Sequence, residues 1–414
     1  MSDGTDAHSA PRNEDDTSTK NAVSVIVGTY GAELAGARLD LSNTRLVPTF
    51  GYAAHRAAVR ALDSHGHLLA SGSNDESIKV YDLRVWREIA EVSTEGATVN
   101  ALSFSAAEEC LLSGGSDGIV SLWNSGGEED FALLRTRKAT TAPILELAAH
   151  PFLPAYAALS SSDELVLSSL AFRKVARVRL QAARGLALAW QPSGEAVAFS
   201  ASKSIAGANV RSASGSGSAR IDALHQVRLV SAQAASEDAH ASAVLPHESR
   251  VTTLCFVDNQ TLLTGSDAAE VLLWDLRTSS KQAGAIANHA SRVRGLAVLP
   301  SGAAIGSEAG ASHLVVSVDS AAELYITDLR SPGEPMVKFS FGQGLRATCM
   351  QIACVGSPPV RPGSRSKRGG IPSRAARQTG NKPQNLEHEH RSGDISTQAK
   401  KRKSHRSATK ESKP

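Results

Sequence analysis

The sequence predicts an all-β protein: a seven-bladed β-propeller whose ring is closed by strands from both ends of the chain. One observation is a repeated segment in which small residues and an acid precede an alternating strand, as in LLASGSNDESIKVYDLR (residues 68–84). Other copies are LLSGGSDGIVSLWNS (111–125), LLTGSDAAEVLLWDLR (262–277) and the weaker VVSVDSAAELYITDLR (315–330). Another is their spacing, 42 residues from Asp82 to Asn124, which is typical of four-stranded propeller blades.

The length suits one large repeat domain or two ordinary domains. The chain has 414 residues, of which 41% are hydrophobic and only 4% aromatic, so its core is expected to consist of small aliphatic side chains. No stretch is long and apolar enough to predict a membrane span. Residues 1–20 are polar and rich in acids, which predicts a disordered acidic N-terminus without a secretory signal. The four cysteines lack metal-ligand spacing, which favours a reduced intracellular compartment.

Strand-like runs separated by Gly, Ser, Asn and Asp extend over residues 21–355, the predicted propeller. VSVIVGTY (23–30) resembles an outer strand with no blade before it, and about six units follow between residues 50 and 330. GLRATCMQIA (344–353) resembles an inner strand with no blade behind it. We expect the two end segments to complete a seventh blade, which leaves no open sheet edge. Within the Ser, Gly and Ala-rich segment 204–226, residues 211–220 are expected to form a mobile loop.

Each blade is expected to contain a polar clasp. In the first clear copy His55 precedes the inner strand, Ser71 lies on the next strand, Asp75 lies in the turn and Tyr81 ends the repeat. Such side chains can hydrogen-bond to one another across a blade, as buried polar groups require. The other copies keep parts of this pattern, namely Ser113, Asp117 and Trp123 in one and His247, Thr264, Asp267 (one residue early) and Trp274 in another.

Blades between residues 135 and 210 keep little of this pattern. In the last copy His289 and Ser317 remain, Asp319 comes two residues early and Thr327 stands where Trp is expected.

The pattern resembles the WD-repeat β-propeller family. The order of VGTYGAELAGARL, ASGSNDESIKVYDLR, LLSGGSDGIVSLWN, AWQPSGEAVAFS and LRATCMQIA is similar to one subgroup, the PAK-interacting protein family, whose yeast member belongs to the maintenance-of-killer group. The resemblance covers residues 22–355 and the character of the tail. It implies a role in assembly of the large (60S) ribosomal subunit in the nucleolus, and animal members are described as restraining a PAK-type protein kinase.

Residues 356–414 are predicted to form a disordered basic tail. From residue 358 onward there are fifteen Lys or Arg and four Asp or Glu, a net charge of +11 against +3 for the whole chain. We interpret the basic clusters as a nuclear-import or RNA-contacting segment rather than a merely solvated tail; they comprise Arg365, Lys367, Arg368, Lys400, Lys401, Arg402 and Lys403. The tail has no aromatic residues, so RNA contact would be made through phosphates and be sensitive to salt.

The sequence gives little support to a catalytic or cofactor-binding role. The acids and histidines recur once per blade, whereas a catalytic set is needed only once. GSGS (215–218) has no phosphate-loop lysine, and HEHR (388–391) lacks a second pair of metal ligands. We therefore expect no enzyme activity, cofactor or metal, and no membrane association.

The first functional hypothesis is a nuclear and nucleolar scaffold, monomeric within a larger assembly, that binds proteins of the pre-60S particle and contacts rRNA through its tail. The second is a cytoplasmic adaptor that binds and inhibits a PAK-type kinase. Arg84, Arg277 and Arg330 end three repeats in the same Asp-Leu-Arg context. They are interpreted either as contacts for acidic partners or as links from blade ends to neighbouring loops.

Overall fold

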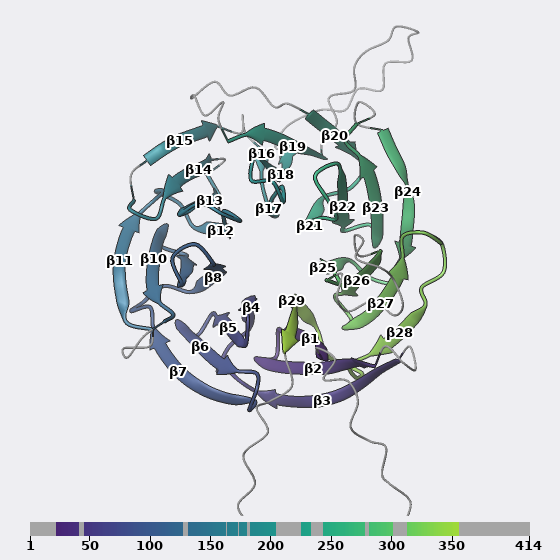
Figure 1. Ribbon diagram of the computed structural model, residues 1–414, viewed down its shortest axis with the longest axis horizontal. Coiled ribbons are helices and arrows are strands. Elements are labelled where there is room, and N and C mark those ends of the chain that lie inside the picture. The colour runs from purple at the N-terminus through teal and green to yellow at the C-terminus, as the bar shows by residue number, and fades with distance from the viewer. Residues whose placement is uncertain are drawn as a thin grey trace, which may run out of the picture. The chain divides into compact units, whose positions relative to one another are not determined.

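The computed structural model is a closed ring of seven antiparallel β-sheets (Figure 1). It describes residues 22–40, 45–126, 131–162, 164–172, 174–179, 183–203, 225–232, 243–277, 281–300 and 313–355. These residues contain strands and turns but no helix, and so no helix that could cross a membrane. The chain divides into two units, residues 1–359 and 360–414, and every described residue belongs to the first. The all-β, seven-bladed prediction is confirmed.

The blades are numbered in chain order, and each is given from the inner to the outer strand. Blade 1 contains β4 (Val59–His65), β5 (Leu68–Ser73), β6 (Ser77–Asp82) and β7 (Arg87–Ser93). Blade 2 contains β8 (Val99–Ser105), β9 (Cys110–Gly115), β10 (Ile119–Asn124) and β11 (Leu133–Lys138). Blade 3 contains β12 (Ile144–Ala149), β13 (Ala155–Ser160), β14 (Glu164–Ser169) and β15 (Lys174–Arg179).

Blade 4 has an interrupted inner strand, made of β16 (Ala183–Arg184) and β17 (Leu188–Trp190), followed by β18 (Ala196–Lys203), β19 (His225–Ser231) and β20 (Ala243–His247). Blade 5 contains β21 (Val251–Phe256), β22 (Thr261–Ser266), β23 (Glu270–Asp275) and β24 (Lys281–Asn288). Blade 6 contains β25 (Val293–Val298), β26 (Leu314–Asp319), β27 (Glu323–Asp328) and β28 (Val337–Ser340).

Blade 7 closes the ring with strands from both ends of the described chain. Its order is β29 (Ala347–Val355), β1 (Ala22–Thr29), β2 (Glu33–Asp40) and β3 (Arg45–Ala53). β29 pairs antiparallel with β1 from Ala22 opposite Val355 to Thr29 opposite Ala347. The predicted closure is therefore confirmed. The prediction that residues 23–30 form an outer strand is wrong, because β2 and β3 continue the sheet beyond β1.

The core lies between the blades. Seven apolar clusters occur, each shared by two neighbouring blades, including one between blades 6 and 7 and one between blades 7 and 1. Two-sided burial explains the strand sequences: in β6 Ile78, Val80 and Tyr81 are all buried. Because every blade packs on two neighbours, the closed ring leaves no sheet face of the core open to water.

Glycine in the repeated small-residue segment allows the next blade to approach. A Cβ atom on Gly114 would lie 2.7 Å from the Ile144 side chain, and one on Gly265 would lie 2.7 Å from Val293. Ile144 and Val293 are the first residues of the inner strands of the following blades. The glycine is thus required by contact between blades as well as by the turn that follows it.

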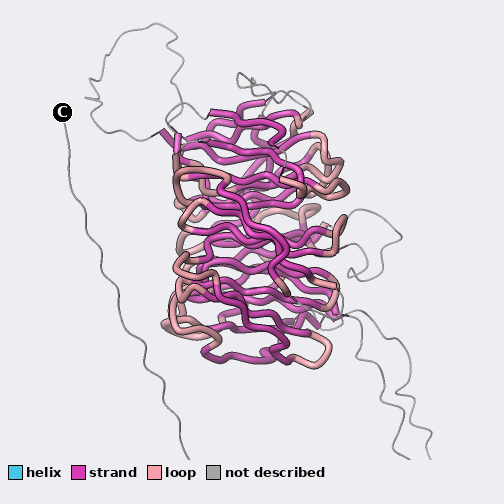
Figure 2. The backbone as a smooth tube through the Cα atoms, turned by 90° about the vertical axis from the view of Figure 1, so that its left-hand side faces the viewer, coloured by secondary structure: helices cyan, strands magenta, loops and turns pink. Residues whose placement is uncertain are grey.

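The loops gather at the two faces of the ring, as the side view in Figure 2 shows. One face carries the connections that precede the inner strands and the turns between second and third strands; residues 54–58 and 74–76 are examples. We call it the clasp face. The other, the opposite face, carries the hairpins between inner and second strands, such as residues 66–67.

Candidate functional site

The clasp of blade 1 joins the predicted residues around one buried histidine. The His55 Nε2 atom lies 2.7 Å from Ser71 Oγ, and Nδ1 lies 3.1 Å from an Asp75 carboxylate oxygen. Asp75 also accepts hydrogen bonds from the Ser77 hydroxyl (2.7 Å) and the Arg56 backbone N–H (2.8 Å). Burial alone would raise the pKa of Asp75, but these hydrogen bonds and His55 lower it to about 2. The carboxylate therefore acts as a fixed acceptor for the turn.

Tyr81 takes the place of Trp in this clasp. Its ring is buried, and its hydroxyl forms no hydrogen bond of good geometry within the described residues.

Burial lowers the pKa of His55 in the same clasp, although Asp75 acts in the opposite direction. His55 is thus a structural, mainly neutral group.

Blade 5 has a complete chain of hydrogen bonds without an acid. The Trp274 Nε1–H donates to Thr264 Oγ1 over 3.1 Å, and Thr264 Oγ1 lies 2.9 Å from His247 Nε2. His247 Nδ1 faces the Leu245 carbonyl at 3.1 Å, which places the ring proton on Nδ1 and makes Nε2 the acceptor. Burial lowers the pKa of His247 to about 4.

Asp267 does not take part in that clasp. Asp267 comes one residue earlier than the repeat pattern expects, and this places it in the turn after β22. There its carboxylate forms an ion pair with Arg250 at 2.7 Å, and its backbone N–H donates to the Arg250 carbonyl. In blade 2 the Trp123 Nε1–H donates to Ser113 Oγ over 2.8 Å, while Asp117 accepts the Ile119 backbone N–H over 2.9 Å without a histidine.

The structure adds one clasp residue that the sequence pattern missed, Tyr325 of blade 6. In blade 6 His289 lies 2.8 Å from the Ser317 hydroxyl, and its ring stacks on Tyr325 with centroids 4.1 Å apart. Tyr325 precedes Thr327 by two residues and so lies on the same face of β27. The sequence signal that could have identified Tyr325 was an aromatic residue two positions before the place where the repeat pattern expects Trp.

The three Asp-Leu-Arg ends have one common geometry. Each arginine folds back onto the aspartate two residues before it, with Nη2–Oδ2 distances of 2.6 Å for Arg84, 2.8 Å for Arg277 and 2.6 Å for Arg330. The same aspartates accept the arginine backbone N–H groups. These guanidinium groups are therefore already paired within their own repeats and are not free contacts for acidic partners.

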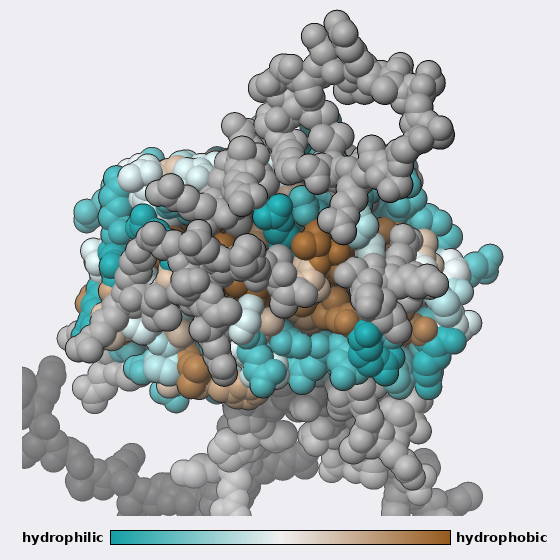
Figure 3. Space-filling view, turned by 90° about the horizontal axis from the view of Figure 1, so that it is seen from above, coloured by the Kyte–Doolittle hydropathy of each residue, from teal (hydrophilic) through white to brown (hydrophobic). Residues whose placement is uncertain are grey.

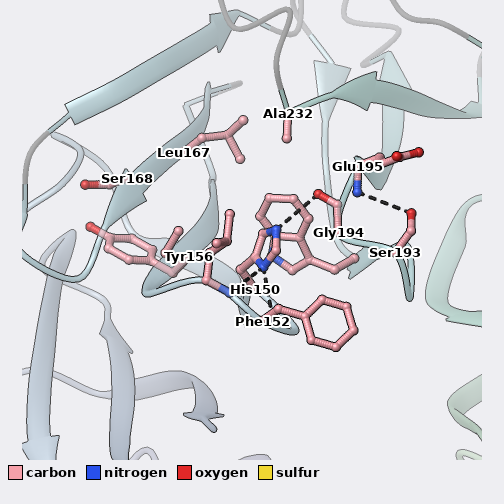
Figure 4. Close-up of a pocket in the computed structure, with 12 residues that line it drawn as sticks. His150, Phe152, Tyr156, Leu167, Ser168, Ser193, Gly194, Glu195 and Ala232 are labelled. Carbon is pink, nitrogen blue, oxygen red and sulfur yellow. Dashed lines mark hydrogen bonds between the residues drawn. The ribbon is translucent and has the colours of Figure 1, made fainter. Parts of the chain in front are cut away.

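An apolar cleft of about 470 Å³ opens on the opposite face between blades 3 and 4 (Figure 4). His150 and Trp190 stand edge to face in its wall, with ring centroids 4.7 Å apart. His150 Nε2 donates to the Gly194 carbonyl over 3.1 Å, and Nδ1 accepts the backbone N–H groups of Phe152 and Leu153. Burial lowers the pKa of His150, so the ring is a neutral support for this hairpin.

The hairpin held by His150 places two large apolar side chains at the rim of the cleft. Phe152 is 69% exposed and Leu153 is 57% exposed. Apolar residues also gather among polar ones on the side of the ring that carries blades 3 to 5 (Figure 3), and Val244 on β20 is 42% exposed. Exposed apolar groups beside an apolar cleft are suited to contact with another protein.

The inner strands carry two carboxylates with raised pKa values. Asp63 on β4 accepts the Phe104 backbone N–H over 2.6 Å and the Gln351 amide over 2.9 Å, linking blades 1, 2 and 7. Burial raises the pKa of Asp63 to about 6 and that of Glu146 on β12 to about 8. No group of three His, Cys, Asp or Glu residues that could hold a metal occurs in the part of the chain that the structure describes. The basic clusters between residues 365 and 403, and the predicted loop 211–220, lie outside the described residues.

Comparison with known proteins agrees with this architecture. The family model "WD domain, G-beta repeat" matches residues 46–82, 87–124 and 241–275. Each match begins at or near the outer strand of one blade and ends with the third strand of the next, so one sequence repeat joins two blades. Similar proteins include a zebrafish (Danio rerio) "p21-activated protein kinase-interacting protein 1-like" (29% identity; 31% of this chain, 34% of the relative).

Two yeast proteins are similar over comparable stretches. They are "Protein MAK11" of Saccharomyces cerevisiae (28% identity; 32% of this chain, 37% of the relative) and "Shk1 kinase-binding protein 15" of Schizosaccharomyces pombe (32% identity; 30% and 37%). The chain contains WD repeats and is similar to the PAK-interacting and MAK11 proteins. The aligned segments span less than half the length of these relatives. The names of the zebrafish and fission yeast relatives describe interaction with or binding to kinases.

Proposed function

We propose that this WD-repeat protein is a non-catalytic scaffold for assembly of the large (60S) ribosomal subunit and maturation of its rRNA in the nucleolus. The similarity to MAK11 and the resemblance in repeat order support this cellular context. The observation that carries the scaffold role is the apolar cleft between blades 3 and 4, with its exposed rim. A rigid ring fixes such a surface relative to the loops of both faces, so that several partners can dock together.

The clasps support a binding role over a catalytic one. Their histidines are buried and hydrogen-bonded at equivalent places in blades 1, 5 and 6. Repetition of the same arrangement around a ring is expected of structural groups. The basic tail is proposed to direct nuclear import or to contact pre-rRNA.

A second candidate is a cytoplasmic adaptor that binds and inhibits a PAK-type kinase. It is favoured by the names of the zebrafish and fission yeast relatives, which describe kinase interaction and kinase binding.

The deciding experiment follows a tagged full-length chain and a version ending at Gly356, in cells and on sucrose gradients. The scaffold proposal expects nucleolar signal and co-sedimentation with large-subunit precursors for the full chain, both lost on truncation. Diffuse cytoplasmic signal for both versions, with capture of a PAK-type kinase and no ribosomal co-sedimentation, would support the adaptor instead.

The cleft is tested within the same experiment. Phe152→Ala with Leu153→Ala removes two exposed side chains at its rim, and we expect co-sedimentation to fall at least about fivefold while the protein stays folded, since hot-spot contacts concentrate in such sites. The matched control is Leu133→Ala with Leu134→Ala, because both side chains are 52% exposed on β11. Equal behaviour of the two double variants would remove the cleft from the docking surface.

A further inference from the structure

One position recurs on the inner strands, where the chain bulges into the central channel. The register shifts after the first residue of β4, β8, β12, β21 and β25, and within the pairing of β29 with β1. The second residue of each of these strands lines the channel near the clasp face; these residues are Arg60, Asn100, Leu145, Thr252, Arg294 and Thr348. A bulge re-aims a side chain in this way.

Three of these residues tie their blade to the next one. The Asn100 amide donates to the Ile144 carbonyl over 2.9 Å, and the hydroxyls of Thr252 and Thr348 donate to the carbonyls of Val293 and Val59, each over 2.6 Å. The accepting carbonyl belongs each time to the first residue of the neighbouring inner strand. A small polar side chain at the bulge therefore has a structural role.

Arginine occupies the same position in blades 1 and 6. Arg60 is exposed and Arg294 is half-buried, and neither forms an ion pair or a side-chain hydrogen bond with any described residue. Arg292, just before β25, and Arg346, just before β29, are also exposed and unpaired within the described chain. All four line one cavity over the adjacent blades 6, 7 and 1. We call this set the arginine mouth.

The arginine mouth is positive even after its acidic neighbours are counted. The carboxylates that line the same cavity among the described residues are Glu146 and Glu323, and neither is paired with one of the four arginines. Burial raises the pKa of Glu146 to about 8, which reduces its negative charge at neutral pH. Burial lowers the pKa of Arg294, and the nearby Arg292, Arg250 and Arg60 act in the same direction, whereas Asp267 raises it. Asp267 is itself paired with Arg250 at 2.7 Å, so it does not neutralise the four arginines of the mouth. Unpaired like charges held together in this way favour an anionic ligand.

We propose that the arginine mouth is a docking site for an acidic segment of a partner protein, whose carboxylates pair with Arg60, Arg292, Arg294 and Arg346. The cavity measures about 1160 Å³, more than the roughly 300–1,000 Å³ of pockets for small ligands, and therefore accommodates a short extended peptide. The planar guanidinium groups provide the fork geometry that carboxylates accept. This site is independent of the choice between the ribosomal and kinase roles.

The lining favours a peptide over RNA. Tyr30 is the one aromatic residue among the described residues that line the cavity. Single-stranded nucleic acid binds best where successive bases stack on several aromatic rings. The other lining groups include amides and hydroxyls, among them Asn100, Gln343 and Gln351, which suit a peptide backbone.

The test measures binding of two fluorescent probes to the full chain by anisotropy. One is a peptide of about twelve residues with alternating Glu and Gly, and the other is an oligouridine of about twelve nucleotides; both are measured at about 50 and 300 mM salt. The mouth variant carries Arg60→Gln, Arg294→Gln and Arg346→Gln. The control variant carries Arg87→Gln, Arg135→Gln and Lys138→Gln on the outer strands β7 and β11, so it loses the same charge. The basic tail is present in all proteins and contributes equally.

We expect the mouth variant to weaken peptide binding at low salt by at least about tenfold, while the control variant changes it less than about twofold. The three arginines are unpaired, so thermal stability should be unchanged; if the triple variant is unstable, Arg60→Gln with Arg294→Gln gives the same comparison. Equal weakening in the mouth and control variants would overturn the proposal. A loss of oligouridine binding as large as, or larger than, the loss of peptide binding would also overturn it, in favour of RNA.

Discussion

Replacing Thr264 with Val removes one hydroxyl from the clasp of blade 5 and keeps the shape of the side chain. The wild-type hydroxyl accepts the Trp274 Nε1–H over 3.1 Å and donates to His247 Nε2 over 2.9 Å. Thr264 is fully buried, Trp274 is 2% exposed and His247 is 7% exposed. Water therefore cannot replace the hydroxyl, and the variant leaves one donor and one acceptor unpaired.

Each buried unpaired polar group costs about 1–3 kcal/mol, so we expect Thr264→Val to lower the free energy of unfolding by about 2–4 kcal/mol. Ser113→Ala in blade 2 leaves only the Trp123 Nε1–H unpaired, because that clasp has no histidine. Its expected loss is about half as large. The measurement is urea unfolding followed by far-UV circular dichroism, with equal m-values required for the comparison.

Thr264→Ser is the control because it keeps the hydroxyl and removes one buried methyl group, at a cost of about 1 kcal/mol. If Thr264→Val is as stable as Thr264→Ser to within about 0.5 kcal/mol, the hydrogen-bond chain does not stabilise the blade and the reasoning is refuted.

Three further outcomes are expected. Burial lowers the pKa of His247 to about 4 from 6.5, so the unfolded chain binds more protons between these values and stability is lost as the pH falls through this window. The buried carboxyl groups of Asp63 and Glu146 have raised pKa values and act in the opposite sense. The check is therefore made by urea unfolding of wild type and His247→Asn at about pH 7.5 and 5, where the variant should lose less stability than wild type. An equal loss of stability in the two proteins would contradict the prediction. Gly194→Ala should lower the free energy of unfolding by at least about 2 kcal/mol, because an added Cβ meets the His150 ring and φ is +75°. Gly66→Ala, with φ +58° and open space around the Cβ, should lower it by about 1 kcal/mol in thermal unfolding. Equal losses in the two variants would exclude the steric contact with His150. Arg330→Ala should leave the midpoint of urea unfolding within error of the wild-type value, because the arginine is exposed and solvent screens its ion pair with Asp328. A clear shift of that midpoint would show that the pair has a further role.

The repeats and the ring could be predicted from the sequence because each of blades 1 to 6 is built from consecutive strands of the chain. The 42-residue spacing, the glycine-containing turns and the unmatched strands near both ends predicted a closed seven-bladed ring, and the pairing of β1 with β29 confirms that closure. The composition of the clasps followed the same repeats. His55 meets Ser71 and Asp75 across only sixteen and twenty positions of the chain, so residues of one repeat were sufficient to indicate the contact.

What the sequence did not determine depends on contacts between blades. Thr348 donates to Val59 across 289 positions, and nothing in either local sequence indicates that pair. Tyr325 replaces the expected Trp because β27 brings it over His289. The arginine mouth collects residues from blades 1, 6 and 7, and the apolar cleft needs the hairpins of blades 3 and 4 side by side. Repetition along the chain thus determined the blades, and only the packing of blades against one another determined the surfaces, because neighbouring blades supply each surface from separate repeats.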